Sequence, residues 1–495
     1  MTSAPDTAVN GKPEPTNLLF ICSDQHSRHV LGCYGNPVVR TPNLDALAAR
    51  GTRLENAYTN TPICVPARSC LATGRYAHTI GSWDNATPYV GTEAPSWGHR
   101  LTQQGHRVTT VGKLHYRAPE DPTGYPDQRL PMHVLAGGGE AYGLLRDRMP
   151  PLSQTRQQVL SAGAGESEYT RYDRAVADAA VSWLRDEMPS QADTSGKPWA
   201  LFVSFVYPHF PLVVPEAYLR PYPLENLPLP VQWHPDEWPH HPVLDWKRQV
   251  QHLDEPIDEP AIRRALQTYC GMVTFLDEQI GRVLAALQES GRAGETRVIY
   301  TSDHGDMMGE HGLWFKSVMY DGAAGVPLIL AGPGVPAGKT VCTNVSLVDC
   351  FPTVLEIVGV LPTPEDAALP GRSLLQLVRE GDRPRTVFSE YHAIYSPSGT
   401  FMVRTERHKY VHYVGPPSQL FDMIDDPDEP CDLAADPAHA STLAACRQHL
   451  YAICDPEQVD RRARADQQRR IEAAGGVQGL ISRGPKIAYT PSPKL

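Results

Sequence analysis

The run Cys-Val-Pro-Ala-Arg at positions 64–68 has the clearest chemical potential in the sequence. Its plain interpretation is a buried cysteine before a helix, because proline suits a first helical turn and free cysteine is common in cores. However, Arg68 lies one turn after Cys64, and a Thr-Gly-Arg triplet follows at 73–75. The N-terminus of such a helix would direct its amides and its positive dipole end at a ligand beside Cys64. The run therefore predicts an anion site next to a candidate nucleophile.

Acidic, amide and imidazole side chains follow two predicted strands. Asp24 and Gln25 come directly after one short apolar run, and Asp303 and His304 come after another. An aspartate at a strand end is more often a cap, and a lone histidine is more often structural. Together, the four residues would supply three oxygen donors and an imidazole, and hard divalent ions favour oxygen-rich ligand sets.

Further basic and polar candidates stand in short motifs. Lys113 and His115 belong to a Gly-Lys-Leu-His run after a predicted strand, His209 to Pro-His-Phe-Pro, and Lys316 ends the run at 309–316. An exposed basic loop is the plain interpretation of Lys113, but its position after a strand favours a functional role. Asn85 is a candidate for contact with a bound anion, and a turn-forming asparagine is an equally weighted alternative.

These motifs resemble the type I sulfatases of the alkaline-phosphatase-like superfamily, whose signature is Cys (or Ser)-x-Pro-x-Arg continuing to Thr-Gly-Arg. The resemblance extends from Asn17 to about Asp436 and includes the Leu-Phe-Asp run at 420–422. It implies that a formylglycine-generating enzyme oxidises Cys64 to formylglycine, whose hydrated aldehyde supplies the attacking oxygen. The competing chemistry is an unmodified thiolate nucleophile.

The resemblance also implies a role for each candidate residue. Arg68, Lys113 and Lys316 would complete a positive pocket, His209 or Lys316 would assist the departing alcohol, and His115 would assist the release of sulfate. The implied ligands of one divalent metal ion are Asp24, Gln25, Cys64, Asp303 and His304. The implied catalytic residues are Cys64, Arg68, Lys113, His115, His209 and Lys316, and the implied substrate-binding residues are Asn85, Lys113, His209 and Lys316.

The metal-site residues depart from the commonest pattern of the family. Many sulfatases carry Asp-Asp and Asp-Asn at the two metal stations, whereas this chain has Asp24-Gln25 and Asp303-His304. That pattern resembles the choline-sulfatase and phosphonate-monoester-hydrolase branch. An imidazole ligand suits Mn²⁺ better than Ca²⁺, and both ions stay open.

The predicted activity is hydrolysis of a small-molecule sulfate monoester. Phosphonate monoester hydrolases usually lack a Lys/His pair like Lys113 and His115, so this pair favours sulfate esters. Additional activity on phosphonate monoesters and phosphate diesters is compatible with this prediction. The alternatives are a phosphonate monoester hydrolase or phosphodiesterase with the same nucleophile, and a non-catalytic binding protein of the same fold.

The elements that must position these residues follow an alternating pattern. Short apolar runs rich in β-formers alternate with amphipathic stretches, which is typical of strands joined by helical crossovers. With the family resemblance, this predicts an α/β fold with a mixed, mostly parallel, alkaline-phosphatase-like sheet sandwiched by helices. Strands are predicted at 18–22, 107–111, 200–205, 297–301 and 327–330, and helices at 43–50, 96–104, 172–187, 259–290 and 348–358.

Two unequal domains are predicted, because 495 residues exceed what one hydrophobic core usually supports. We expect a flexible N-terminal segment (1–16), a catalytic domain (17–383), a small C-terminal α+β domain with an antiparallel sheet (384–454), and a C-terminal helix and tail (455–495). Within the last two parts, strands are predicted at 386–391, 401–404 and 409–413, and helices at 442–453 and 457–474.

Composition and charge limit the classes of partner. The net charge of -11 argues against a broad surface for nucleic acid or anionic membrane, so any anion site must be local. The ten cysteines lack the spacing of a disulfide scaffold and are expected to be mostly reduced. The polar N-terminus has no signal-peptide pattern, and no apolar run reaches roughly 20 residues, which favours a cytoplasmic protein without membrane spans.

Three features carry weaker expectations. Two long segments, 114–165 and 221–256, either shape the binding site or decorate the surface. The tail after 455 is a candidate cap for the site of a neighbouring subunit, which would make the enzyme a homo-oligomer. Some aromatic side chains either line an aromatic or cationic pocket or, as is more common, are buried in the core. They are Trp83, Trp97, Tyr116, Trp314 and His392.

Overall fold

An eight-stranded mixed sheet forms the centre of the structure, a computed structural model that describes residues 14–148, 154–188, 196–483 and 489–494. The strands lie in the order β11-β2-β10-β9-β1-β7-β4-β5. Strand β10 is antiparallel to both neighbours, and the other neighbouring pairs are parallel, which confirms the mostly parallel sheet. The bounds are β1 (Asn17–Asp24), β2 (Gly51–Leu54), β4 (Val108–Lys113), β5 (Asp127–Met132), β7 (Ala200–Pro208), β9 (Thr296–Ser302), β10 (Leu328–Ala331) and β11 (Lys339–Val341).

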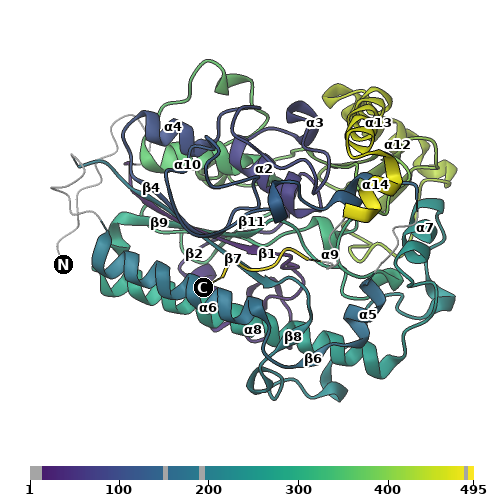
Figure 1. The fold of residues 1–495 in the computed structure, drawn as a ribbon, viewed down its shortest axis with the longest axis horizontal. Helices are drawn as coiled ribbons and strands as arrows, with labels where there is room; N and C mark the ends of the chain where they lie inside the picture. The colour runs from purple at the N-terminus through teal and green to yellow at the C-terminus, as the bar shows by residue number, and fades with distance from the viewer. Residues whose placement is uncertain (1–13, 149–153, 189–195, 484–488, 495) are drawn as a thin grey trace.

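Helices cover both faces of this sheet (Figure 1). Successive side chains of a strand point to opposite faces, so an apolar strand such as β1 must be covered on both sides. Leu19 and Ile21 join one apolar cluster, and Leu18 and Phe20 join the other. The first cluster contains side chains of α1 (Pro42–Ala49), α6 (Glu168–Ser182) and α8 (Glu259–Glu289), and the second contains those of α4 (Trp97–Gln103), α10 (Cys350–Val358) and α11 (Leu374–Glu380).

The parallel strands β4, β7, β1 and β9 end at one edge of the sheet. Asp24 ends β1 and Lys113 ends β4, while His209 directly follows β7 and Asp303 directly follows β9. Because the carboxyl ends of parallel strands coincide, four residues that are far apart in the sequence meet at this edge. The sheet thereby positions the predicted chemistry.

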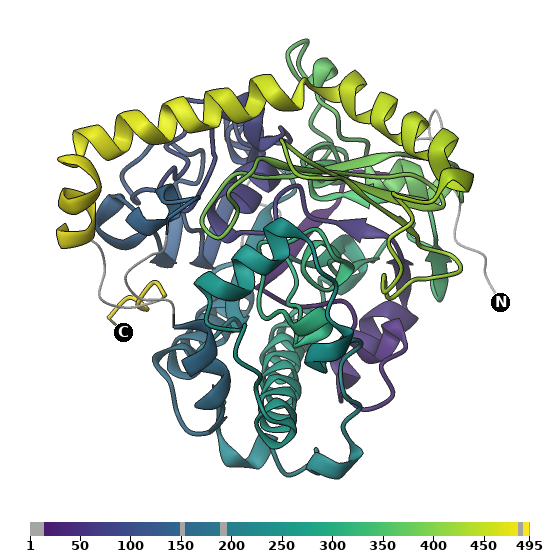
Figure 2. The same cartoon turned by 90° about the vertical axis from the view of Figure 1, so that its right-hand side faces the viewer.

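A second sheet, antiparallel and four-stranded, follows in the C-terminal part of the chain. Helix α12 (Ala440–Ile453) packs against it, because Cys446 and Leu450 share an apolar cluster with Phe388 and Leu420 of the sheet. Helix α13 (Pro456–Ala473) then crosses the top of the molecule in Figure 2 and leads to α14 (Gly476–Arg483). The strands, in sheet order, are β13 (Val387–Tyr391), β14 (Thr400–Arg404), β15 (His408–Tyr413) and β16 (Gln419–Asp422). The predicted antiparallel C-terminal sheet is confirmed, and the exact domain bounds stay a prediction.

Further short strands and helices lie between these elements, besides several 3₁₀ turns. They are the paired strands β3 (Ala57–Tyr58) and β12 (Val345–Ser346), the paired strands β6 (Gly163–Ala164) and β8 (Val213–Val214), and the helices α2 (Cys64–Thr73), α3 (Ala77–Ile80), α5 (Thr155–Leu160), α7 (Pro242–Val250) and α9 (Asp321–Ala324).

Several elements differ from the sequence predictions. The helix predicted at 172–187 begins at Glu168, because the Ser167 side chain caps its first turn by accepting the Thr170 N–H. The helix predicted at 348–358 begins at Cys350, after a 3₁₀ turn. Strands β2, β5, β11 and β16 of the two larger sheets had no separate prediction. Of the segment predicted to be flexible (1–16), residues 1–13 lie outside the described residues.

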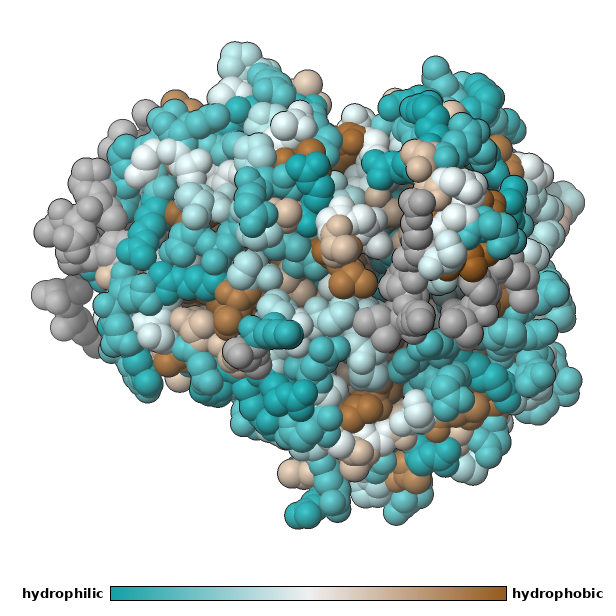
Figure 3. Space-filling model, viewed as in Figure 1, coloured by the Kyte–Doolittle hydropathy of each residue, from teal (hydrophilic) through white to brown (hydrophobic). Residues whose placement is uncertain are grey.

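The surface and the cysteines fit an ordinary globular domain. The face in Figure 3 is mostly hydrophilic, with apolar side chains scattered singly or in small groups. All ten cysteines are free thiols in the structure. Across the helices that the structure describes, none combines the length and apolar character needed to cross a membrane.

A buried cluster of charges joins the C-terminal sheet to the main sheet's loops. Lys409 of β15 contacts Asp321 at the start of α9, and its Nζ lies 2.8 Å from Glu429 Oε1. Arg28, which follows β1, contacts the same Asp321. Lys409 is fully buried, so its charge is compensated by these carboxylates rather than by water.

We expect Lys409→Met to lower the free energy of unfolding by about 3–5 kcal/mol, because it leaves a buried carboxylate without its cation. Urea denaturation followed by circular dichroism measures the change. Arg407→Met is the matched control, since it removes ion pairs of the exposed Arg407 with Asp422 and Asp425 from the same hairpin. Its midpoint should move far less, and equal shifts for the two variants would contradict the importance of the buried cluster.

Candidate active site

Helix α2 places Cys64 at its first position, at the edge where the parallel strands end. Ile63 before it is extended, and Gly74 after it adopts a left-handed conformation with φ 67°, so the backbone begins and ends the helix within the predicted run. Every residue of α2 is buried, which holds Cys64 firmly in place. The predicted helix N-terminus beside Cys64 is therefore present in the structure.

Three side chains approach the Cys64 sulfur closely enough to share an ion with its position. The ligand-type atoms of Asp24, Cys64, Asp303 and His304 all lie within 4.8 Å of one another, and all four residues are buried. The Cys64 Sγ is 3.6 Å from Asp24 Oδ1 and 3.2 Å from His304 Nε2. Two carboxylates and an imidazole form a donor set that suits a divalent cation.

Gln25 adjoins this cluster, and Asp306 orients its amide. Gln25 Nε2 donates to Asp306 Oδ2 at 2.7 Å, and the Gln25 backbone N–H donates to Asp303 Oδ1 at 3.2 Å. Within the described part of the chain, Gln25 Oε1 is buried and has no hydrogen-bond partner. Such an atom is costly unless something binds it, and an ion at this cluster would do so. The residues present therefore fit a divalent ion, and the orienting role of Asp306 had not been predicted.

Buried cations compensate the carboxylates and leave the site positive. Burial alone would raise the pKa of Asp24, but Lys113 and the neighbouring cations outweigh burial and hold it well below its usual range. Arg68, Lys113 and Lys316 supply three positive charges against the two of Asp24 and Asp303. The contacts are Lys113 Nζ to Asp24 Oδ2 at 2.6 Å, Arg68 Nε to Asp303 Oδ2 at 2.7 Å, and Lys316 Nζ to Cys64 Sγ at 3.0 Å.

The unmodified Cys64 side chain is a poor nucleophile in this setting. Burial, reinforced by the Asp24 carboxylate, raises the pKa of the Cys64 thiol to about 11. The thiolate, rather than the thiol, is the reactive form of cysteine. At neutral pH the unmodified residue is therefore a neutral thiol, despite the three cations nearby.

The two histidines predicted to transfer protons are both neutral. His209 Nδ1 lies 2.6 Å from the Phe210 carbonyl oxygen, which can only accept, so Nδ1 carries the proton and Nε2 the lone pair. Burial and Lys316 hold the pKa of His209 well below its usual range. Burial and Lys113 do the same to the pKa of His115, whose Nε2 is 3.0 Å from Thr490 Oγ1.

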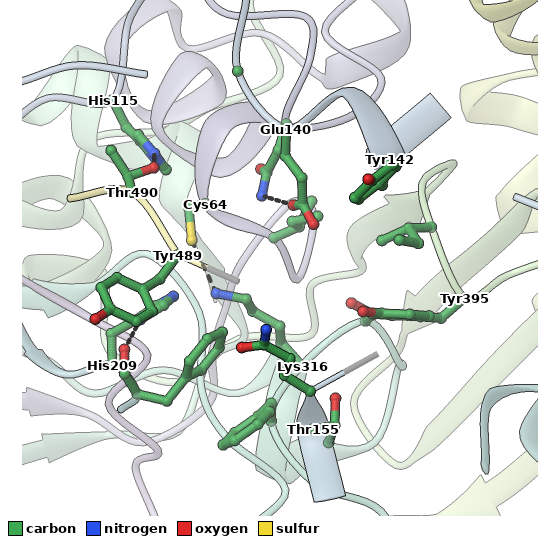
Figure 4. A pocket seen from close by; sticks show the side chains of 18 of the residues that line it. Cys64, His115, Glu140, Tyr142, Thr155, His209, Lys316, Tyr395, Tyr489 and Thr490 are labelled. Atoms are coloured by element: carbon green, nitrogen blue, oxygen red, sulfur yellow. Dashed lines mark hydrogen bonds between the residues drawn. The ribbon is translucent and has the colours of Figure 1, made fainter. Parts of the chain in front are cut away.

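A pocket opens in front of Cys64 (Figure 4). His115, His209 and Lys316 lie around Cys64, and Tyr142 and Tyr395 lie across the pocket, at the right of the view. Asn85 also lines the pocket; its Oδ1 accepts the Val65 N–H at 3.2 Å, and its Nδ2 donates to Glu140 Oε2 at 3.2 Å. The structure thus brings the predicted catalytic, substrate-binding and metal-ligating residues to one place.

The long segment 114–165 shapes this pocket, and the sequence did not single out its individual residues. It contributes Val134, Leu135, Glu140, Tyr142 and residues of α5, whereas segment 221–256 contributes Gln251. The pocket interpretation of five other aromatic residues was wrong. Not one of Trp83, Trp97, Tyr116, Trp314 and His392 is among the described lining residues, and all five are buried in the core.

The C-terminal tail also reaches the pocket. Tyr489 and Thr490 line the pocket of their own chain, and a cap over a neighbouring subunit's site stays a prediction. No sequence signal marked these two residues, since they stand in a short polar, proline-containing stretch.

Comparisons with known proteins agree with this geometry. The Sulfatase family model matches residues 16–360, and the model of the N-sulphoglucosamine sulphohydrolase C-terminal region matches residues 309–455. The chain is 32% identical to a choline-sulfatase of Rhizobium meliloti, over 93% of this chain and 91% of that protein. It is 30% identical to arylsulfatase K of Bos taurus, over 86% of this chain and 80% of that protein.

Solved structures show the same fold. A phosphonate monoester hydrolase from Silicibacter pomeroyi superposes with a TM-score of 0.71 at 26% identity, covering 88% of this chain and 94% of that one. A phosphonate monoester hydrolase of Agrobacterium radiobacter superposes with a TM-score of 0.69 at 24% identity, covering 91% and 96%, which supports the fold alone. The family model and the full-length relatives confirm the family that the motifs predicted: the chain belongs to the sulfatase family, as a sulfuric ester hydrolase with the alkaline-phosphatase-like fold.

Proposed function

We propose that this enzyme hydrolyses a sulfate monoester to an alcohol and sulfate through formylglycine formed from Cys64. The convergence of groups on one sulfur atom carries the proposal. Cys64 Sγ lies within 3.6 Å of the Asp24 carboxylate, the His304 imidazole and the Lys316 ammonium group, at the N-terminus of α2. These groups suit a charged oxygen nucleophile and an anionic substrate, whereas the thiol itself stays protonated.

The Cys64 sulfur marks the place of an oxygen of the modified residue. A formylglycine-generating enzyme would convert the Cβ of Cys64 from a thiol carbon to an aldehyde, with loss of sulfur and consumption of an external oxidant. Hydration of the aldehyde then places two hydroxyl groups on one carbon. All ten cysteines are free, which supports our proposal that the protein works in a reducing compartment such as the cytoplasm.

Asp24, Gln25, Asp303 and His304 would hold one divalent ion beside position 64. When bound, such an ion makes a nearby hydroxyl more acidic and neutralises negative charge on the sulfate group. The His304 imidazole favours Mn²⁺ over Ca²⁺, and both ions are candidates.

The chain's own residues bind the sulfate group and assist the alcohol. Arg68, Lys113 and Lys316 stabilise the charge of the transferring group while one hydroxyl at position 64 loses its proton to solvent and attacks sulfur. The bond between sulfur and the ester oxygen breaks, and that oxygen takes a proton. Lys316 is the better donor, because neutral His209 offers only a lone pair at Nε2, where it can accept a hydrogen bond.

His115 completes the cycle by releasing sulfate. It accepts the proton of the second hydroxyl at position 64, so the carbonyl forms again as the carbon–oxygen bond to sulfate breaks. Water then hydrates the aldehyde and restores the starting state.

A phosphonate monoester hydrolase is the second candidate function, favoured by the metal-site residues and the Silicibacter pomeroyi structure. The presence of both Lys113 and His115 at the pocket favours sulfate.

We further propose that the alcohol part of the substrate carries no additional anionic group. The basic side chains among the described lining residues are Lys113, His115, His209 and Lys316, and all four serve the sulfate end. The rest of the lining contains one carboxylate, Glu140, beside amide, hydroxyl and apolar groups. A second anionic group on the alcohol part of the substrate would therefore be repelled by Glu140 and would find no further basic side chain among the described lining residues.

We expect Cys64→Ser to lower steady-state turnover by at least about 10³-fold, because an ester on its single hydroxyl has no second hydroxyl from which to eliminate sulfate. Intact mass spectrometry should show either one trapped sulfuryl group per chain or an inert protein. Cys70→Ser, six residues later on the same buried helix, is the matched control and should keep turnover. Full turnover by Cys64→Ser would refute the proposed cycle. If active wild-type enzyme yields a peptide in which Cys64 is unmodified, formylglycine is refuted as the nucleophile.

Asp306→Asn should weaken divalent metal binding by about 10–100-fold. The single oxygen of the new amide is needed by the Met308 and Phe315 N–H groups, so an NH₂ donor would face Gln25 Nε2 and the Gln25 oxygen would lose its orientation. Elemental analysis and calorimetric titration of chelator-treated protein with Mn²⁺ or Ca²⁺ measure the change. The effect should not add to that of Gln25→Ala. Additive losses would show that Asp306 does not act through Gln25.

An aryl sulfate with a ring carboxylate should have a kcat/KM about tenfold or more below that of the uncharged parent ester, because of repulsion by Glu140. Glu140→Gln should narrow this gap while acting less on the uncharged ester. Equal kcat/KM values for the two esters would contradict the proposed substrate class. Phosphonate monoesters and phosphate diesters of the same phenol, tested in parallel, decide between the two candidate functions.

A further inference from the structure

The C-terminal segment Tyr489–Lys494 lies beside the catalytic groups of its own chain. In Figure 1 it is the yellow trace that ends at C, apart from the yellow helices α13 and α14. Tyr489 and Thr490 line the pocket in which Cys64 lies (Figure 4). The Thr490 Oγ1 is 3.0 Å from His115 Nε2, so the tail reaches a residue that we assign to sulfate release.

The first turn of α6 anchors this segment. The Tyr169 hydroxyl donates to the Thr490 carbonyl oxygen at 2.5 Å, and the Tyr169 and Tyr489 rings meet edge to face, with centroids 5.3 Å apart. The Ser492 N–H donates to Glu168 Oε2 at 3.2 Å. Tyr169 is fully buried, so the anchor belongs to the rigid core. These contacts fix the Thr490 backbone and limit where its hydroxyl can lie.

His115 depends on such a partner more than an ordinary histidine would. Its backbone is left-handed, with φ 61°, a conformation that non-glycine residues seldom adopt. Its Nδ1 is buried and has no hydrogen-bond partner among the described residues. A neutral imidazole has one N–H and one lone pair, and a hydroxyl can accept the Nε2–H. In that arrangement Nδ1 carries the lone pair and is free to take a proton.

We propose that Thr490 is a positioning residue for His115, and that the C-terminal segment is therefore part of the active site. Its hydroxyl fixes the ring orientation and the tautomer in which Nδ1 accepts the proton of the second hydroxyl at position 64. No bond to Thr490 forms or breaks. The inference rests on the proposed role of His115 in sulfate release.

Thr490→Val removes the hydroxyl at nearly constant shape, and Thr490→Ser keeps it. The valine variant should lower kcat about tenfold, the typical effect of one hydrogen bond, with KM unchanged or lower. Because release is slowed and attack is not, the sulfated form of residue 64 should accumulate in acid-quenched samples analysed by mass spectrometry. The serine variant should restore both properties. A fall in kcat without accumulation, or with no rescue by serine, would overturn the inference.

His115→Ala separates a failure of this inference from a failure of the proposed function. If His115→Ala turns over normally and accumulates no sulfated enzyme, the assigned role of His115 is wrong. If it accumulates sulfated enzyme while Thr490→Val behaves as wild type, the role of Thr490 alone is wrong. In the His115→Ala background, Thr490→Val should have no further effect on release, and an undiminished effect would contradict action through His115.

Two variants test whether each tail serves its own site. Removing residues 489–495 should reproduce the accumulation seen with Thr490→Val, because the hydroxyl is lost together with its anchor. Co-expression of this truncated chain with full-length Cys64→Ala should stay as slow as the truncated chain alone. Recovery of wild-type kcat in the mixture would show that the tail acts on a neighbouring chain and would overturn the arrangement within one chain.

Discussion

The site depends on the compensation of two carboxylates that the fold buries completely. Asp24 and Asp303 have no exposed surface, and burying an unpaired charge costs several kcal/mol even after relaxation. Lys113 and Arg68 provide the compensation, and Arg68 also contacts Asp24 at 3.4 Å. Only elements that end at the same edge can bring these groups together. The parallel arrangement of β4, β1 and β9, with α2 beside them, is thus an electrostatic requirement as well as a packing solution.

The same charge balance explains how an acidic protein can bind an anion. The chain carries a net charge of -11, yet the cations around Cys64 outnumber the carboxylates that face them. Burial in a low-dielectric pocket makes these nearby charges dominate over the distant acidic surface. Lys316 reaches the site because Asp306 Oδ1 accepts the N–H groups of Met308 and Phe315, which orders the loop before it. Asp306 therefore supports both Gln25 and Lys316.

The sequence predicted the chemical centre better than the pocket around it. Cys64, Arg68, Lys113 and Asp303 stand in motifs with fixed spacing, directly after strands or within one helical turn, so local pattern locates them. Glu140 and Thr490 stand in irregular segments without periodicity, and only the folded chain shows that they line the pocket. The aromatic candidates failed for a related reason: large rings are drawn into the core first, and sequence alone does not show which rings remain at a surface. The antiparallel direction of β10 depends on a chain reversal that its apolar composition does not encode.

The metal-side residues and the Lys113–His115 pair point toward different relatives, and physical chemistry reconciles them. A sulfate monoester and a phosphonate monoester each carry one negative charge and present a tetrahedral centre, so the positive pocket, with a divalent ion bound, would hold both similarly. Binding energy common to two substrates cannot discriminate between them. Discrimination must then arise where the two reactions differ, in the breakdown of the covalent intermediate and in the contacts of the leaving alcohol. The first is the task assigned to His115, and the second falls to the wall that contains Glu140 and Tyr142. Under the proposed function, the selectivity of this enzyme would therefore depend on the irregular segments that deliver Thr490 and Glu140, rather than on the strand ends around the anion site.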